Sequence, residues 1–310
     1  FKNGEGVKMK FGIVPREWGE FAAEAIEQAQ LAEKLGFHSV WIEEHHSNDY
    51  YLPSPLIALA AISQHIPKMY VGTAVAILPL YHPVRFASDG AILDQVTGGK
   101  FIAGLGIGYR GYEYDYFGLS LRERGARMNE AVEIVKRLWE GEKLYYDGKY
   151  YKVKNLELKP RPLQRPRPPI WIGGWKPKAL RRAALMGDRW LAGPAADFDY
   201  LKECKQTYIN ALKECGKKFE GFSLMREVYV ADTEERAYEE VKDSVIQMYL
   251  KDYGTTPHPL LAQFKEDVRG LIEKRYLIGT PSQVIEKIAY LQKEGVDYLH
   301  CNTTFDQLLD

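Results

Sequence analysis

Short hydrophobic runs alternate along the chain with longer stretches in which apolar residues recur every three or four positions. The short runs are typical of β-strands, and the longer stretches of amphipathic helices. The run over residues 69–78 has almost no polar position, which indicates a strand covered on both faces, as in a parallel sheet. We predict eight strands, over residues 10–14, 39–42, 69–78, 100–105, 169–173, 189–192, 222–230 and 296–301.

The helical stretches between these strands have typical boundary residues. Gly36 follows the first of them, and Pro55 stands in the first turn of the second. Eight strands alternating with helices in 310 residues indicate the α/β class and a (β/α)8 TIM barrel with insertions at its catalytic face. We expect one domain over residues 1–310, with a frayed terminus at 1–8. Further helices are expected from near residue 122 to 139 and at 177–186, 198–215, 237–248 and 281–294.

Three segments interrupt the alternation of strands and helices. Residues 106–118 read as a glycine-rich and aromatic loop. Residues 144–169 hold five prolines in their second half, which favours an extended polyproline-type crossing over the barrel rather than a domain linker. The polar stretch 253–276 is expected to act as a lid, because long inserts at a catalytic face commonly do.

Composition excludes several classes of protein. The 42 basic residues balance 42 acidic ones, so the chain has no electrostatic footprint for nucleic acid or for an anionic membrane. It has no apolar run long enough to cross a bilayer and no signal-peptide pattern. Three cysteines provide neither a disulfide framework nor a zinc pairing. We therefore expect a soluble, cytoplasmic protein.

The C-terminal ends of the strands are where the chemistry of a TIM barrel takes place. The first strand is followed by no pair of metal ligands, which disfavours a metal-dependent hydrolase. The second leads into Glu43, Glu44, His45 and His46. Neighbouring strand residues point to opposite faces, so the two histidines are not expected to chelate one ion. Each histidine is a candidate proton shuttle or a structural hydrogen-bonding group.

Two glycine-rich strand ends could accept a ligand. Residues 106–111 match the dinucleotide motif G-x-G-x-x-G, but 112–118 do not read as the helix that this motif requires. The glycines still allow a flat or phosphorylated ligand to approach the backbone. Residues 173–175 precede a predicted helix, with Lys176 and Arg181 nearby. This segment is either an anion site or a plain turn.

Taken together, these strand ends resemble the bacterial luciferase-like monooxygenase family, a group of (β/α)8 enzymes that use flavin or deazaflavin. The likeness runs from about residue 10 to residue 302 and depends on the order and spacing of several motifs. The motifs are residues 36–46, 71–79, 82–85, 93–95, 99–101 with Gly104, 169–174 and 279–281.

The resemblance implies a role for each matching residue. His45 falls on the histidine that acts as base and substrate-side catalyst in the luciferases. A non-proline cis peptide between Ala74 and Val75 would form a bulge behind the flavin ring. The residues implied for the two loops that hold the flavin and its phosphate are Gly106, Gly108, Tyr109 and Arg110 in one loop and Gly173, Gly174, Trp175 and Lys176 in the other.

Departures from the family pattern concern the phosphate and the type of cofactor. Ile107 stands where the luciferases have a phosphate-binding arginine, so Arg110 would have to take its place. The run from Gly108 to Arg110, with Glu113 and Tyr114 close behind, is similar to relatives that use a deazaflavin. The run Glu44 to His46 is more similar to the flavin mononucleotide (FMN) branch. FMN, reduced and non-covalently bound, is the favoured cofactor, and the deazaflavin coenzyme F420 is the alternative.

The function that these observations favour is a flavin-dependent monooxygenase acting with dioxygen on a small organic substrate. The alternatives are a deazaflavin-dependent dehydrogenase, a non-catalytic flavin-binding protein, and a phosphate-binding metabolic barrel without flavin. The partners expected are the substrate, dioxygen and a separate flavin reductase, with neither nucleic acid nor membrane. A homo-oligomer is compatible with the sequence.

Overall fold

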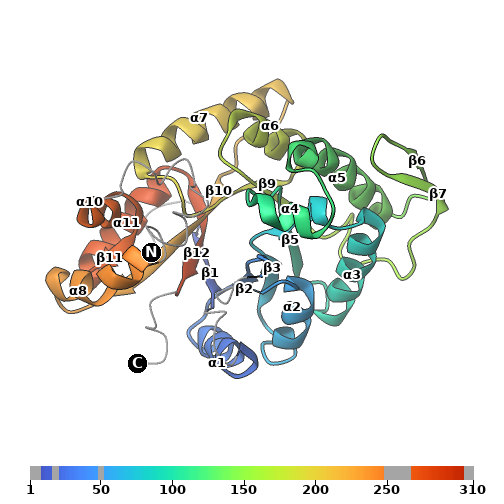
Figure 1. Ribbon diagram of the computed structural model, residues 1–310. Coiled ribbons are helices and arrows are strands. Elements are labelled where there is room, and N and C mark those ends of the chain that lie inside the picture. Colours follow the sequence, from blue (N-terminus) through green and yellow to red (C-terminus); the bar gives the residue numbers. More distant parts are fainter. Residues whose placement is uncertain (1–7, 16–20, 48–51, 248–266, 304–310) are drawn as a thin grey trace.

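Eight parallel strands close into a barrel (Figure 1). The computed structural model describes residues 8–15, 21–47, 52–247 and 267–303. The last barrel strand lies beside the first, and β9 pairs with β10, which completes the ring. The TIM barrel predicted from the alternation is confirmed. In order around the ring the strands are β1 (Lys10–Val14), β2 (Ser39–Ile42), β3 (Tyr70–Thr73), β5 (Phe101–Gly106), β8 (Ile170–Gly173), β9 (Arg189–Ala192), β10 (Phe222–Val230) and β12 (Val296–Asn302).

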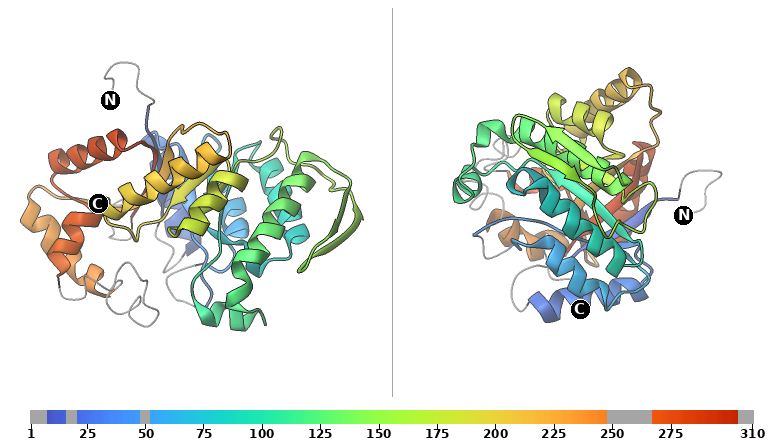
Figure 2. Two further views of the ribbon diagram at one scale, coloured as in Figure 1. Left: turned by 90° about the horizontal axis from the view of Figure 1, so that it is seen from above. Right: turned by 90° about the vertical axis from the view of Figure 1, so that its right-hand side faces the viewer.

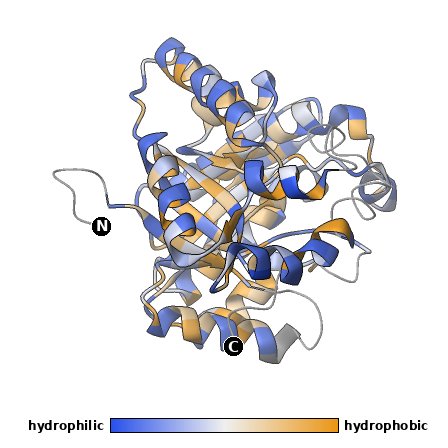
Figure 3. Cartoon of the chain, turned by 90° about the vertical axis from the view of Figure 1, so that its left-hand side faces the viewer, coloured by the Kyte–Doolittle hydropathy of each residue, from blue (hydrophilic) through white to orange (hydrophobic). Residues whose placement is uncertain are grey.

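Helices surround the barrel, as two further views show (Figure 2). Their apolar faces pack on the outward-facing strand residues, such as Val40 and Ile172, with Leu59, Phe86 and Trp139 from the helices. Hydrophobic residues gather on the strands and on the inner helix faces, and hydrophilic ones lie outside (Figure 3). The covering helices are α1 (Phe21–Lys34), α2 (Pro55–Ser63), α3 (Pro83–Val96), α5 (Arg124–Glu140), α6 (Pro177–Met186), α7 (Phe198–Glu214), α8 (Glu234–Val245) and α11 (Pro281–Lys293).

Large aromatic side chains fill the inside of the barrel. Trp41, Trp171 and Tyr298 form one buried cluster there. Gly12 and Gly72 make room for the indole of Trp41, since a Cβ on either residue would come within 2.7 Å of it. The barrel is therefore a packed core and not a pore, as expected for this fold.

The predicted strand over residues 69–78 is interrupted. A cis peptide joins Ala74 to Val75, as the resemblance implied, and separates β3 from β4 (Ala76–Ile77). On β5 the partner residues advance from 102 to 105 while this strand advances from 72 to 76. One extra residue must be accommodated, and the chain bulges. A 3-10 turn, η1 (Leu78–Leu80), follows.

The segment after β5 contains a helix that the sequence analysis did not predict. Residues 112–118 were not expected to start a helix, yet α4 (Gly111–Tyr116) begins there. Tyr114 is fully buried beside Ile77 and Leu80, and its hydroxyl donates to the carbonyl of Ile107. This packing compensates for the weak helical pattern. The turn η2 (Leu121–Glu123) leads into α5.

The prediction for residues 144–169 is wrong in its first half. Strands β6 (Leu144–Asp147) and β7 (Lys152–Leu156) form an antiparallel hairpin on the outer side of α5 (Figures 1 and 2). The carboxylate of Glu130 accepts three backbone N–H bonds, from Lys149, Tyr150 and Tyr151, at 3.0–3.1 Å. This one side chain therefore holds the turn of the hairpin.

The C-terminal part adds elements outside the eight-stranded ring. Helix α10 (Val268–Arg275) and strand β11 (Leu277–Gly279), which pairs with β10, were both missed by the sequence analysis. The expected lid falls on residues 253–276, of which 253–266 lie outside the described residues. In the described part of the chain, no helix has the length and hydrophobicity needed to cross a membrane.

Candidate functional site

A cavity of about 380 Å³ opens at the C-terminal ends of the barrel strands. That volume lies within the range of small-molecule sites, roughly 300–1,000 Å³. His45 lines it, together with nine of the ten residues that sequence analysis selected for a cofactor. Those nine are Ala74, Val75, Gly106, Gly108, Tyr109, Gly173, Gly174, Trp175 and Lys176.

The bulge at Ala74 and Val75 forms one wall of the cavity. A Cβ added to Gly106 would lie 2.3 Å from Cγ2 of Val75, and one added to Gly173 would lie 3.2 Å from its Cγ1. The side chain of Val75 thus occupies the space that two neighbouring strands leave open by having glycine. Gly108 has a φ of +63°, which favours glycine at this position. The result is a smooth, apolar wall of backbone and one valine.

His45 is held by the unpredicted helix α4. Its Nδ1 lies 2.9 Å from Oε1 of Glu113, and the same oxygen accepts the backbone N–H of His46 at 3.1 Å. A carboxylate at Nδ1 places the basic lone pair of the neutral ring on Nε2. Burial lowers the pKa of His45, while Glu113 partly opposes that shift. Burial alone would raise the pKa of Glu113, but the bonds from His45 and His46 outweigh it and the pKa is lowered.

His46 faces a different cavity from its neighbour. It lines a space of about 370 Å³ beside Phe117 and Tyr81, and its Nε2 lies 2.9 Å from Oε1 of Glu44. The hydrogen bond to Glu44 raises the pKa of His46, and burial raises the pKa of Glu44. The two histidines therefore point to opposite sides, as their places in the chain predict. Among the described residues no three His, Cys, Asp or Glu side chains form a metal-binding group.

Glu43 is an acid of the cavity wall that the sequence analysis did not single out. Burial and the nearby carboxyl of Glu227 raise its pKa to about 8, although Arg110 acts in the opposite direction. A carboxyl group with this pKa is mostly protonated at neutral pH and can then donate a hydrogen bond.

Arg110 is the one selected residue that does not line the cavity. Its side chain is 4% exposed, and Nη1 donates to the hydroxyl of Tyr112 at 2.8 Å. It lies close enough to His45 and Glu113 to influence both pKa values. The arginine on the cavity wall is Arg124, at the start of α5, which the sequence analysis missed. Its Nε is buried and has no hydrogen-bond partner among the described residues.

The loop after β8 supplies the second cation of the cavity. Lys176 stands directly before α6, where Pro177 occupies the first helical turn. Trp175 packs edge-on against Trp190 at a centroid distance of 5.5 Å, and Trp190 donates to the carbonyl of Gly174. The tryptophan pair fixes the loop, so that Lys176 and the N-terminus of α6 both favour an anion at this end of the cavity.

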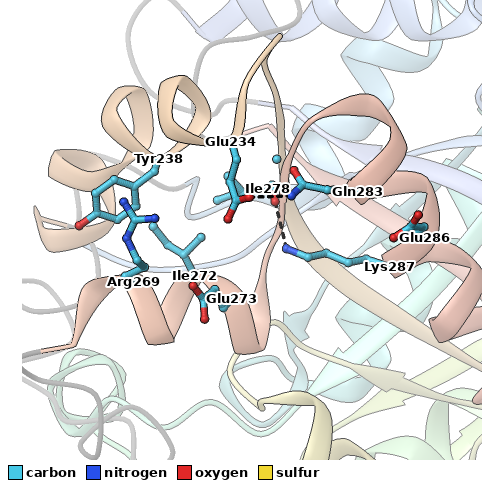
Figure 4. A pocket seen from close by; sticks show the side chains of 10 residues that line it. Glu234, Tyr238, Arg269, Ile272, Glu273, Ile278, Gln283, Glu286 and Lys287 are labelled. Carbon is cyan, nitrogen blue, oxygen red and sulfur yellow. Dashed lines mark hydrogen bonds between the residues drawn. The ribbon is translucent and has the colours of Figure 1, made fainter.

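A smaller cavity, of about 200 Å³, lies between α8, α10 and α11 (Figure 4). Its polar side chains bind one another or the backbone. Gln283 donates to Glu234 at 2.7 Å, and Lys287 donates to the carbonyl of Ile278 at 3.0 Å. It contains no residue that the sequence analysis selected, and we do not assign the activity to it.

Comparisons with known proteins agree with this site. A sequence model of the family described as luciferase-like monooxygenase matches residues 12–298. The chain is 25% identical over 294 residues to the oxygenase component of flavin-dependent trigonelline monooxygenase from Acinetobacter baylyi, which covers 88% of this chain and 81% of that protein. It is 28% identical over 301 residues to F420-dependent glucose-6-phosphate dehydrogenase from Microbacterium testaceum, which covers 89% and 86%.

A solved structure shows the same fold. The oxygenating constituent of 3,6-diketocamphane monooxygenase from the CAM plasmid of Pseudomonas putida, solved in complex with FMN, superposes with a TM-score of 0.81. The match covers 97% of this chain and 93% of that one, at 20% sequence identity.

Proposed function

The chain belongs to the luciferase-like monooxygenase family, and from that premise we propose that it binds reduced FMN in the cavity at the barrel mouth and oxidises a small organic substrate with dioxygen. The observation that carries this proposal is the convergence of three features on one cavity. These are the glycine-lined wall behind Val75, the cations Arg124 and Lys176, and His45 held by Glu113.

The residues present fit a flavin. The wall of Val75 with Gly106 and Gly173 gives a flat ring an apolar surface to lie against, because those glycines leave no side chain in the way. Tyr109 and Trp175 add aromatic surface to the same cavity.

The phosphate would be held by Arg124, Lys176 and the N-terminus of α6. The buried Nε of Arg124 has no partner among the described residues, and a buried donor without a partner costs free energy that an anionic ligand would recover. We therefore transfer the phosphate role from Arg110 to Arg124. Arg110 instead acts as a buried positive charge beside Glu43, His45 and Glu113.

When bound, reduced flavin supplies the electrons that activate dioxygen, which is the chemistry that the cofactor contributes. The protein contributes a water-poor cavity and proton handling. His45 would accept or return a proton at Nε2, since Glu113 holds Nδ1. Protonated Glu43 would donate a hydrogen bond to a polar group in the cavity. Removal of water from this site strengthens each of these interactions.

The identity of the cofactor is part of the proposal. Among the relatives compared above, one carries flavin in its printed name and one carries F420. We favour FMN because the run from Glu44 to His46 is similar to that branch of the family. We also propose that a separate cytoplasmic reductase supplies the reduced flavin, since the relative from Acinetobacter baylyi is named as an oxygenase component.

Titration with four ligands tests the proposal: FMN, riboflavin, and coenzyme F420 in its oxidised and reduced forms. FMN should bind more tightly than riboflavin by at least tenfold, and Arg124→Met should remove most of that difference because it removes the phosphate contact. Reduced FMN bound to the protein in air should then consume dioxygen together with a substrate. Equal binding of FMN and riboflavin would contradict the phosphate site, and preferential binding of F420 would favour a dehydrogenase.

A further inference from the structure

A column of aromatic side chains continues downward from the floor of the cavity. The rings of Trp41 and Trp171 stack at a centroid distance of 5.0 Å, and Tyr298 meets Trp171 edge-on, also at 5.0 Å. Ala74 and Leu191 line the cavity and belong to the same packed cluster as these rings. Aromatic contact is therefore continuous from just below the cavity to Tyr298.

Tyr298 has a polar environment deep inside the barrel. Its hydroxyl oxygen lies 2.6 Å from Nδ1 of His38 and 2.6 Å from Oγ of Ser39. Ser39 also accepts the indole N–H of Trp41 at 2.6 Å. Burial and the charge of Lys10 lower the pKa of His38 to about 4, so its imidazole is neutral at pH 7 and can accept the phenolic proton.

The column ends at the opposite end of the barrel from the active-site cavity. His38 stacks on Tyr70 at 4.7 Å and lines a cavity of about 360 Å³ between the start of β1 and α11. Lys8 and Lys10 line the same space. A small anionic reductant, such as ascorbate, would be attracted to these charges.

We propose that Trp171, Trp41 and Tyr298 form a path for oxidising equivalents, with Tyr298 as a redox-active tyrosine that releases its proton to His38. The path rests on the proposed function, because the oxidant would be a one-electron oxidant formed when dioxygen is reduced in the cavity without substrate. It would carry the oxidising equivalent away from the cavity and so protect His45 and the cavity wall.

The electrons and protons of this path balance. The oxidant takes one electron from the indole of Trp171 or Trp41 and leaves an indole radical cation. Tyr298 passes one electron to that indole, and its phenolic proton moves to Nδ1 of His38, which gives a neutral tyrosyl radical and an imidazolium. A reductant at the lower cavity returns one electron to Tyr298, and His38 returns the proton.

Packing alone does not account for these polar groups. Phenylalanine would fill the same space at residue 298 without burying a hydroxyl group, which is costly unless it is fully bonded. Tyr208 provides the contrast. It is also buried, and its ring lies 5.7 Å from Trp190, but its hydroxyl bonds to the backbone of Trp190 and not to a histidine.

Electron paramagnetic resonance tests the path without any flavin. The protein is frozen while ultraviolet light excites its indoles, with chloropentaamminecobalt(III) present to take one electron irreversibly. We expect a tyrosyl radical signal that falls at least fivefold in Tyr298→Phe and is unchanged in the matched control Tyr208→Phe. His38→Gln should convert tyrosyl signal into indole radical signal, because the proton acceptor is lost. This second variant keeps the test decisive if Tyr298→Phe does not fold.

A second arm loads the protein with FMN and uses blue light. The tyrosyl signal should again depend on Tyr298 and survive in Tyr109→Phe, although Tyr109 lies on the cavity wall itself. An unchanged signal in Tyr298→Phe, or its loss in Tyr109→Phe, would overturn the inference. Failure of FMN to bind would count against the proposed function, while the flavin-free arm would still decide the path.

Discussion

Replacing Glu43 by glutamine removes a carboxyl group whose charged form the cavity disfavours. The pKa of Glu43 is raised from 4.5 to about 8, with burial as the main cause and Glu227 as the second. Between these two values the folded protein holds a proton that the unfolded chain has released. The folded state is therefore progressively destabilised as pH rises from about 4.5 to about 8, and the loss is constant above that range.

The magnitude follows from the size of the shift. One pKa unit corresponds to about 1.4 kcal/mol, so a shift from 4.5 to about 8 sets a ceiling of about 5 kcal/mol above pH 8. Glu43 lines the cavity, where contact with water reduces this figure. We expect Glu43→Gln to raise the free energy of unfolding by roughly 1–3 kcal/mol at pH 8 and by little at pH 5.

Urea unfolding of both proteins at pH 5, 6.5 and 8 measures this difference. Glu220→Gln is the matched control, because Glu220 is exposed and should show no such pH dependence. The reasoning would be refuted by a gain of equal size at pH 5 and pH 8. It would equally be refuted if the variant were less stable than the native protein at pH 8.

Three further predictions concern binding, rate and assembly. His45→Ala should slow turnover by roughly 10²–10⁴-fold, as measured by substrate-dependent dioxygen uptake, with FMN affinity and the thermal midpoint nearly unchanged. Gly108→Leu should abolish FMN binding in fluorescence titrations, whereas Gly216→Leu, at another positive φ but in open space, should bind normally. The exposed side chains of Ile57 on α2 and Ile92 on α3, 74% and 47% accessible, indicate a homodimer contact. Ile57→Lys should therefore shift the mass measured by light scattering to that of a monomer.

The barrel itself was predictable from local patterns. Seven of its strands lie within one or two residues of their predicted ends, because the apolar runs are short and glycine or proline often bounds them. Periodicity could not reveal the break in the remaining run, over residues 69–78. Ala74 and Val75 are as apolar as their neighbours, and the extra residue is visible only when the run is paired with β5. The resemblance to a family supplied that break.

The elements that were missed depend on contacts between distant residues. Helix α4 has a weak pattern of its own, and it is stabilised by the burial of Tyr114 against Ile77 and Leu80. The hairpin of β6 and β7 depends on Glu130, which lies some 20 residues before the turn that it holds. No local propensity contains such information, because tertiary packing supplies the free energy.

The exchange of Arg110 for Arg124 has the same origin. Both arginines follow the glycine-rich end of β5, and both carry the charge that a phosphate needs. If residues 112–118 form an irregular loop, Arg110 is the nearer choice. Because α4 begins at residue 111, Arg110 is instead directed toward Tyr112 and the interior, and the chain returns to the cavity only at the start of α5. One unpredicted helix of six residues therefore reassigned the phosphate site.

The same helix explains why the acidic residues near the site are misleading in the sequence. Glu43, Glu44 and Glu113 could belong to a solvated surface, yet in the fold each is withdrawn from water. Burial of three carboxyl groups is affordable only because each meets a different partner. Glu113 meets His45, Glu44 meets His46, and Glu43 holds its own proton. The properties of His45 are thus set by α4 as much as by β2, and no motif confined to residues 43–46 could specify them.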